Sequence, residues 1–108
     1  MASGSFRFVK PYVVAPEAED DLRQIWRYLL REASLAVADR IQSELVDAFE
    51  GLADVPGKGH KRSDLTNRDV LFFSVYQYLI VYHPTELVEI VAVLHGKRNV
   101  ERLLKSRS

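Results

Sequence analysis

The spacing of apolar residues predicts a helix in the first third of the chain. From Pro16 onward, apolar side chains recur at three- and four-residue steps, as on one face of an amphipathic helix. They are Ala18, Leu22, Ile25, Trp26, Leu29 and Ala33. Pro16 suits the first helical position, where a backbone N–H would have no partner. We interpret the acidic residues Glu17, Glu19, Asp20 and Asp21 as compensation of the helix dipole.

A second helix follows almost at once. Ser34 is a favourable N-cap residue, and a new apolar stripe with helical spacing begins after it. Its members are Ala38, Ile41, Leu45, Ala48, Phe49 and Leu52. Two amphipathic helices joined by so short a link predict an antiparallel helical hairpin.

The pattern changes to that of strands after a polar loop over residues 56–69. β-branched and aromatic residues dominate three runs, which favours strands. The runs are Val70 to Val75, Tyr78 to Tyr82, and Leu87 to His95. A tight turn at Tyr76-Gln77 joins the first two, and the third is long enough to be central. A short helix over Asn99 to Lys105 follows.

One more strand is expected before the helices, over Phe8 to Val14, and Pro11 predicts that its end is unpaired or at a sheet edge. The order β-α-α-β-β-β-α defines an α+β fold, in which a helical hairpin packs on a mostly antiparallel four-stranded sheet. The length of 108 residues fits one domain, over residues 6–105, after a flexible tail at residues 1–5.

The composition and the spacing of residues exclude several kinds of functional site. There is no cysteine, which excludes a disulfide scaffold and a thiol nucleophile. His60, His83 and His95 lack the spacing of metal ligands, and no cofactor-binding glycine motif is present. We therefore expect no metal and no cofactor. Neither a signal peptide nor a membrane-spanning run is recognisable, so we expect a cytoplasmic protein.

The formal net charge is zero, yet the two halves of the chain differ in sign. Residues 1–55 hold six basic and ten acidic groups, whereas residues 56–108 hold nine basic and five acidic groups. This excess is too small to predict sequence-specific nucleic-acid binding. The alternatives are two solvated faces of opposite sign, or a basic C-terminal surface that meets an acidic partner.

Several short stretches occur in a fixed order along the chain. They are Ala15-Pro16-Glu17-Ala18, Asp21-Leu22, Ile25-Trp26-Arg27-Tyr28, Phe49 with Leu52-Ala53-Asp54-Val55-Pro56-Gly57, Tyr78-Leu79-Ile80-Val81-Tyr82, and Ile90-Val91-Ala92-Val93-Leu94-His95-Gly96-Lys97-Arg98. The last is the most specific, because an apolar strand runs into His-Gly-Lys-Arg and then a short helix. With these stretches the chain resembles the ParE branch of the RelE/ParE superfamily of type II toxins, over about residues 8–105.

The resemblance implies a toxin that a ParD-like antitoxin wraps and neutralises. RelE-like members cut mRNA on the ribosome, whereas ParE-like members inhibit DNA gyrase and stabilise cleaved DNA. Apolar residues stand where the nucleases carry catalytic groups, at Val70, Phe72, Leu79 and Leu104, and only Arg98 is kept. We therefore predict a non-enzymatic gyrase inhibitor that acts on the A subunit. The alternatives are a ribosome-dependent mRNA endonuclease and a non-toxic relic that only binds antitoxin.

Two groups of residues are candidates for binding. The target-binding candidates are His95, Lys97, Arg98, Arg102 and Lys105. The cations at the start of the final helix oppose its dipole, so helix stability does not explain them. Arg102 and Lys105 lie in the last turns of this helix, where positive charge suits the dipole, so helix stability is the simpler explanation for them. The antitoxin-binding candidates are Tyr28, Leu30 and Val37, apolar residues expected to be exposed on the helical hairpin, as a groove for an amphipathic segment. A sheet edge offers a place for an added strand as well.

Overall fold

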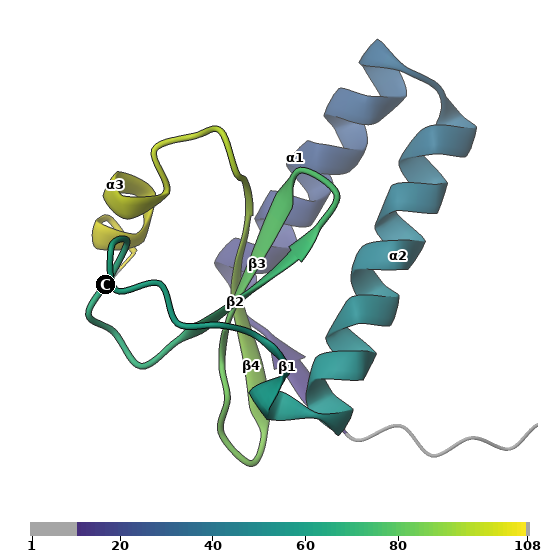
Figure 1. The fold of residues 1–108 in the computed structure, drawn as a ribbon. Helices are drawn as coiled ribbons and strands as arrows, with labels where there is room; N and C mark the ends of the chain where they lie inside the picture. The colour runs from purple at the N-terminus through teal and green to yellow at the C-terminus, as the bar shows by residue number, and fades with distance from the viewer. Residues whose placement is uncertain (1–10, 108) are drawn as a thin grey trace, which may run out of the picture.

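A computed structural model describes residues 11–107 and shows a sheet with helices on both faces (Figure 1). The elements are β1 (Tyr12–Val14), α1 (Pro16–Glu32), α2 (Leu35–Asp54), the short 3-10 helix η1 (Pro56–Lys58), β2 (Leu71–Val75), β3 (Tyr78–His83), β4 (Val88–His95) and α3 (Val100–Lys105). The predicted α+β order is confirmed. The predicted positions Phe8 to Lys10 of the first strand, and the tail at residues 1–5, lie outside the described residues.

The helical hairpin forms as its sequence predicts. α1 begins at Pro16, and the Ser34 hydroxyl accepts a hydrogen bond from the Val37 N–H at 3.1 Å, which caps α2. Trp26 Nε1 donates to Asp39 Oδ1 at 3.1 Å and ties the two helices together. Ala33, predicted on the apolar face of the first helix, is exposed because α1 ends one residue earlier.

The four strands lie in the order β1-β4-β3-β2, so β4 is central as predicted. The β2–β3 and β3–β4 pairs are antiparallel, and only the edge strand β1 is parallel to its neighbour β4. Tyr76 and Gln77 form the predicted two-residue turn between β2 and β3. Tyr76 adopts a φ of 55°, a conformation that is uncommon for a residue other than glycine.

A β-bulge in β4 decides which face its side chains reach. Val81 pairs with Ala92 whereas Tyr82 pairs with Ile90, so Val91 is the extra residue. Val91 and Ala92 both pack on the α3 side, and Val93 returns to the face that α1 and α2 cover. The bulge therefore reverses the alternation that the first half of β4 began.

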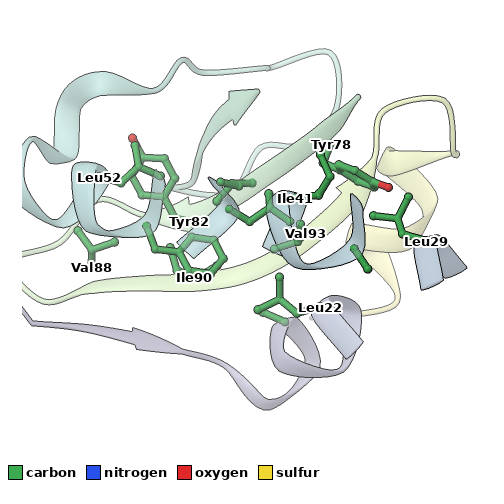
Figure 2. Close-up of a cluster of buried hydrophobic side chains, with 14 residues drawn as sticks. Leu22, Leu29, Ile41, Leu52, Tyr78, Tyr82, Val88, Ile90 and Val93 are labelled. Carbon is green, nitrogen blue, oxygen red and sulfur yellow. The ribbon is translucent and has the colours of Figure 1, made fainter. Parts of the chain in front are cut away.

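Two apolar cores form, one on each face of the sheet. The larger lies between the helical hairpin and the sheet and includes Leu22, Leu45, Phe49, Ile80, Tyr82 and Ile90; Figure 2 shows part of it. The smaller lies beneath α3 and consists of Val70, Phe72, Val81, Ala92, Leu94, Val100 and Leu104. Within the described residues, no helix is long and apolar enough to cross a membrane.

Candidate partner-binding groove

A groove of about 660 Å³ lies between α1 and the second half of β4. It exists because β1 is short and pairs with β4 only from Val88 to Ile90. Beyond that point α1 runs beside β4 in place of a strand. Gln24, Arg27, Tyr28 and Arg31 line the α1 side, and Val93 and His95 line the β4 side. Gln77 and Arg98 also contribute to its wall.

Asp21 forms the base of this groove and joins three parts of the chain. Its carboxylate is buried and accepts two hydrogen bonds from the Arg107 guanidinium, both at 2.7 Å. It also accepts the backbone N–H of Val93 at 2.9 Å. The hydrogen bond to Asp21 raises the pKa of Arg107, and the charges of Asp21, Glu17 and Asp20 add to this effect while burial opposes it.

The prediction that Asp21 serves only to compensate the helix dipole is therefore wrong. Its carboxylate neutralises the guanidinium near the C-terminus and satisfies a strand N–H. The sequence offers no sign of this pairing, because Asp21 and Arg107 are 86 positions apart.

Aromatic rings and His95 form one side of the groove. The His95 ring meets the Tyr78 ring edge to face, with centroids 5.7 Å apart. His95 Nδ1 accepts the Lys97 backbone N–H at 3.1 Å, so the neutral ring carries its proton on Nε2. Burial raises the pKa of Tyr78, and the nearby Tyr28 adds to this increase. The groove therefore offers ring edges and a ring N–H donor.

The charged side chains on the groove are mainly cations. Arg27 and Arg98 are exposed and form no ion pair within the described part of the chain. Arg31 pairs with Glu32 at 3.3 Å and lies 6.0 Å from the centroid of the Tyr28 ring. Because Arg107 already neutralises Asp21, the walls carry an excess of positive charge.

The predicted target-binding residues separate into two regions. His95 and Arg98 lie on the groove, whereas Arg102 and Lys105 lie exposed on α3, where Lys105 Nζ is 3.9 Å from Glu101 Oε2. Lys97 is exposed in the turn after β4. α3 begins at Val100 with Asn99 as its N-cap, so Lys97 and Arg98 precede the helix instead of starting it.

The predicted antitoxin-binding residues do not form one surface. Tyr28 and Leu30 are 53% and 41% exposed, as predicted. They are two positions apart on α1 and therefore point in different directions, and only Tyr28 lines the groove. The predicted exposure of Val37 is wrong, because Val37 is half-buried against the main core.

The positions compared with the RelE-like nucleases lie inside the smaller core. Val70, Phe72 and Leu104 are buried there, and Leu79 packs against them. The described residues contain no group of three His, Asp or Glu side chains arranged to hold a metal ion. This region therefore consists of packed apolar side chains.

The sequence contained a signal for part of the groove that our prediction missed. Gln24, Arg27, Tyr28 and Arg31 follow each other at three- and four-residue steps and therefore share one face of α1. This face adjoins the apolar stripe and carries two arginines beside the Tyr28 ring.

The fold is that of a small α+β protein, with a helical hairpin and a short third helix on a four-stranded mixed sheet and a groove between α1 and the central strand β4. Residues 12–100 match the family described as ParE toxin of type II toxin-antitoxin system, parDE, and the chain belongs to this family. A chain from the solved structure of the chromosomal ParDE toxin-antitoxin system of P. aeruginosa has the same fold, with a TM-score of 0.70 at 13% identity. The match covers 82% of this chain and 98% of that one. None of the curated proteins matches this sequence.

Proposed function

We propose that this ParE-type toxin inhibits DNA gyrase by binding to it, without chemistry of its own, and stabilises cleaved DNA. A ParD-like antitoxin neutralises it, and both act in the cytoplasm. Membership of the ParE family supports the toxin assignment. The observation that carries the choice of mechanism is the packing of Val70, Phe72, Leu79 and Leu104 in the smaller core.

Metal-free RNA cleavage needs a base, an acid and cations around the reacting phosphate. The nuclease-like positions of this chain hold aliphatic and aromatic side chains that contact one another and α3. Arg98 is the one cation kept, and a single guanidinium cannot supply both proton transfers. A binding mechanism requires none of these groups.

Arg98 and His95 are our first candidates for contact with the gyrase A subunit. Lys97 extends this basic end of the sheet, and Arg102 and Lys105 extend it over α3. For the antitoxin we propose contacts with Tyr28 and Leu30 on α1. Val37 packs against the larger core.

A supercoiling assay tests the proposal. Purified protein is added to gyrase, relaxed plasmid and ATP, and we expect lost supercoiling with accumulation of linear DNA. Arg98→Glu should abolish most of the inhibition. Arg23→Glu is the matched control, since Arg23 is exposed on α1, pairs with Asp20 and lies outside the groove.

Unaffected gyrase at excess protein would contradict the proposal. A translating extract then separates the alternatives. Cleaved messages would indicate an RelE-type endonuclease, and intact messages together with harmless expression would indicate a relic that only binds antitoxin.

A further inference from the structure

The backbone N–H groups of the turn after β4, from Gly96 to Arg98, all have hydrogen-bond partners. The Gly96 N–H donates to the Gln77 carbonyl at 2.7 Å, and the Arg98 N–H donates to the His95 carbonyl at 3.0 Å. The Lys97 N–H donates to Nδ1 of the His95 ring at 3.1 Å. These hydrogen bonds hold the backbone of an exposed turn in one conformation.

Both ends of this turn are anchored in packed parts of the fold. Leu94 before it and Val100 after it are buried in the smaller core. The Gln77 carbonyl belongs to the turn between β2 and β3, where the Tyr76 phenol donates to Glu44 on α2 at 3.0 Å. The turn after β4 therefore starts and ends at fixed points, and only its exposed middle needs a further hydrogen bond to stay ordered.

The His95 ring lies so that its Nδ1 reaches the backbone two residues further on. The ring is half-buried and meets the Tyr78 ring edge to face, with centroids 5.7 Å apart. Asparagine and aspartate commonly accept the same N–H, with a side-chain oxygen in the place of Nδ1. His95 therefore closes a turn of the Asx type, and only the neutral tautomer with its proton on Nε2 can do so.

The turn presents two cations to solvent. Lys97 and Arg98 are exposed, and neither forms an ion pair within the part of the chain that the structure describes. A partner that binds these side chains meets a backbone that is already ordered. Binding therefore loses less conformational entropy than it would on a mobile loop.

We propose that His95 is a positioning residue, which fixes this turn through Nδ1 and thereby presents Lys97 and Arg98 to their target. The proposal rests on the proposed function in one respect, namely that gyrase is that target. The role requires the Nδ1 acceptor. It requires neither the aromatic ring nor the Nε2–H donor, so it differs from a direct contact between His95 and gyrase.

Two substitutions separate these properties of the ring. His95→Asn keeps an acceptor for the Lys97 N–H and removes both the aromatic ring and the Nε2–H donor. His95→Phe keeps a ring that packs on Tyr78 and removes the acceptor. Positioning predicts that asparagine is tolerated and phenylalanine is not. Ring packing predicts the opposite order, and direct contact through Nε2–H predicts that both variants fail.

The supercoiling assay measures the functional effect. We expect His95→Phe to need at least about tenfold more protein for the same inhibition, and His95→Asn to need at most about threefold more. His83→Phe is the matched control, because His83 is also half-buried at a strand end and its Nδ1 lies 3.0 Å from the Asp69 carbonyl oxygen. It lies outside the groove, and we expect full inhibition.

Nuclear magnetic resonance tests the positioning role without gyrase. In mildly alkaline buffer, the nitrogen chemical shifts of the His95 ring should show an unprotonated Nδ1 and a protonated Nε2. The heteronuclear Overhauser effects of the Lys97 and Arg98 amides should fall in His95→Phe and stay high in His95→Asn. A protonated Nδ1, or equally ordered amides in all variants, would overturn the proposal.

Thermal melting shows whether each variant is folded, and the ring shifts are measured on the unsubstituted protein, so they do not depend on any variant. If the unsubstituted protein leaves gyrase unaffected, the proposed function fails, and the resonance data alone decide whether His95 holds the turn. If gyrase is inhibited but His95→Asn fails like His95→Phe, or both inhibit fully, only the positioning role is overturned.

Discussion

At the scale of single residues, Asp21 makes the contacts most distant in sequence. One carboxylate joins α1, the edge of β4 and the segment after α3 through its bonds to Val93 and Arg107. Removing one partner of a buried ion pair leaves the other charge without compensation, which is strongly destabilising.

We therefore expect Asp21→Asn to lower the free energy of unfolding by roughly 3 kcal/mol. Asp20→Asn is the control, since the Asp20–Arg23 pair is exposed and contributes at most about 0.5 kcal/mol. Urea unfolding measures both. Similar losses for the two variants would contradict the structural role of Asp21.

Gly59 is constrained by close packing and not by its backbone angles. A Cβ at this position would lie 2.6 Å from Tyr82 Oη and 2.9 Å from the Phe72 carbonyl oxygen, whereas a Cβ at Gly57 meets nothing within 4 Å. Gly59→Ala should therefore lower the free energy of unfolding by about 1–3 kcal/mol. Gly57→Ala should be neutral or raise it by roughly 0.5 kcal/mol. Urea unfolding of the two variants compares these sites, and equal effects would contradict the packing argument.

Tyr82 should make stability depend on alkaline pH. Burial raises its pKa above the ordinary 10.0, although the hydrogen bond from Gly59 opposes this. The unfolded chain then loses the proton first, so this contribution is fully present below about pH 10 and is lost as pH rises through the folded pKa.

The phenol also donates to the Pro56 carbonyl at 2.7 Å and accepts from Gly59 at 2.9 Å. Tyr82→Phe should therefore be less stable by about 1–2 kcal/mol at pH 8. The difference should shrink above about pH 10. Urea unfolding from pH 8 to 11 measures it, and parallel curves for the two proteins would contradict the buried-phenol argument.

At the scale of elements, the N-cap of α2 is an example of a local sequence signal. The start of α2 depends on Ser34, whose hydroxyl satisfies the Val37 N–H. We expect Ser34→Ala to cost about 1 kcal/mol and Ser34→Gly only a few tenths. Thermal or urea unfolding followed by circular dichroism distinguishes them. An unchanged stability of Ser34→Ala would show that the hydroxyl hydrogen bond does not stabilise the start of α2.

The helices and strands were largely predictable, because the spacing of apolar side chains and the residue types at turns are local properties of the sequence. The start of α1, the cap of α2 and the Tyr76-Gln77 turn match the prediction, whereas α1 ends one residue before the predicted Ala33. The bulge at Val91 was not predictable, since the run from Ile90 to Leu94 is entirely apolar and has the same pattern with or without a change of face. The short reach of β1 along β4, which leaves the groove open, depends on where α1 begins to pack.

At the scale of the whole molecule, one sheet supports two cores. Leu104 on α3 belongs to the smaller core, whereas Trp26 packs against the larger one on the opposite face. Because β3 and β4 contribute side chains to both, loss of one core should weaken the other, and the chain should unfold as one cooperative unit.

We expect Leu104→Ala to cost about 2–5 kcal/mol. The transition reported by Trp26 fluorescence should shift together with that reported by circular dichroism. The exposed Leu35 provides the control, since Leu35→Ala should change stability by less than about 0.5 kcal/mol. An unchanged Trp26 transition in Leu104→Ala would show that α3 and its core unfold independently.

Of the candidate site, the sequence indicated only some of the residues, and the tertiary structure decided which of them meet. Arg98 and Tyr28 were recognisable as a cation after an apolar strand and an aromatic ring off the apolar face of a helix. Their meeting in one groove was not, because α1 and the end of β4 approach only when the sheet is assembled. The half-burial of Val37 likewise follows from the packing of α2 on the core.

The amino-acid sequence by itself determined the order of helices and strands, the two apolar faces that drive their packing, and the family to which the chain belongs. The order and the apolar faces follow from side-chain periodicity, which acts over a few residues, and the family follows from the ordered set of short stretches that resemble it. The tertiary structure alone decided the Asp21–Arg107 pair, the open side of β4 and the burial of the nuclease-like positions. Each depends on contacts between segments far apart in the chain, and no local pattern records which distant charge or strand edge a residue will face.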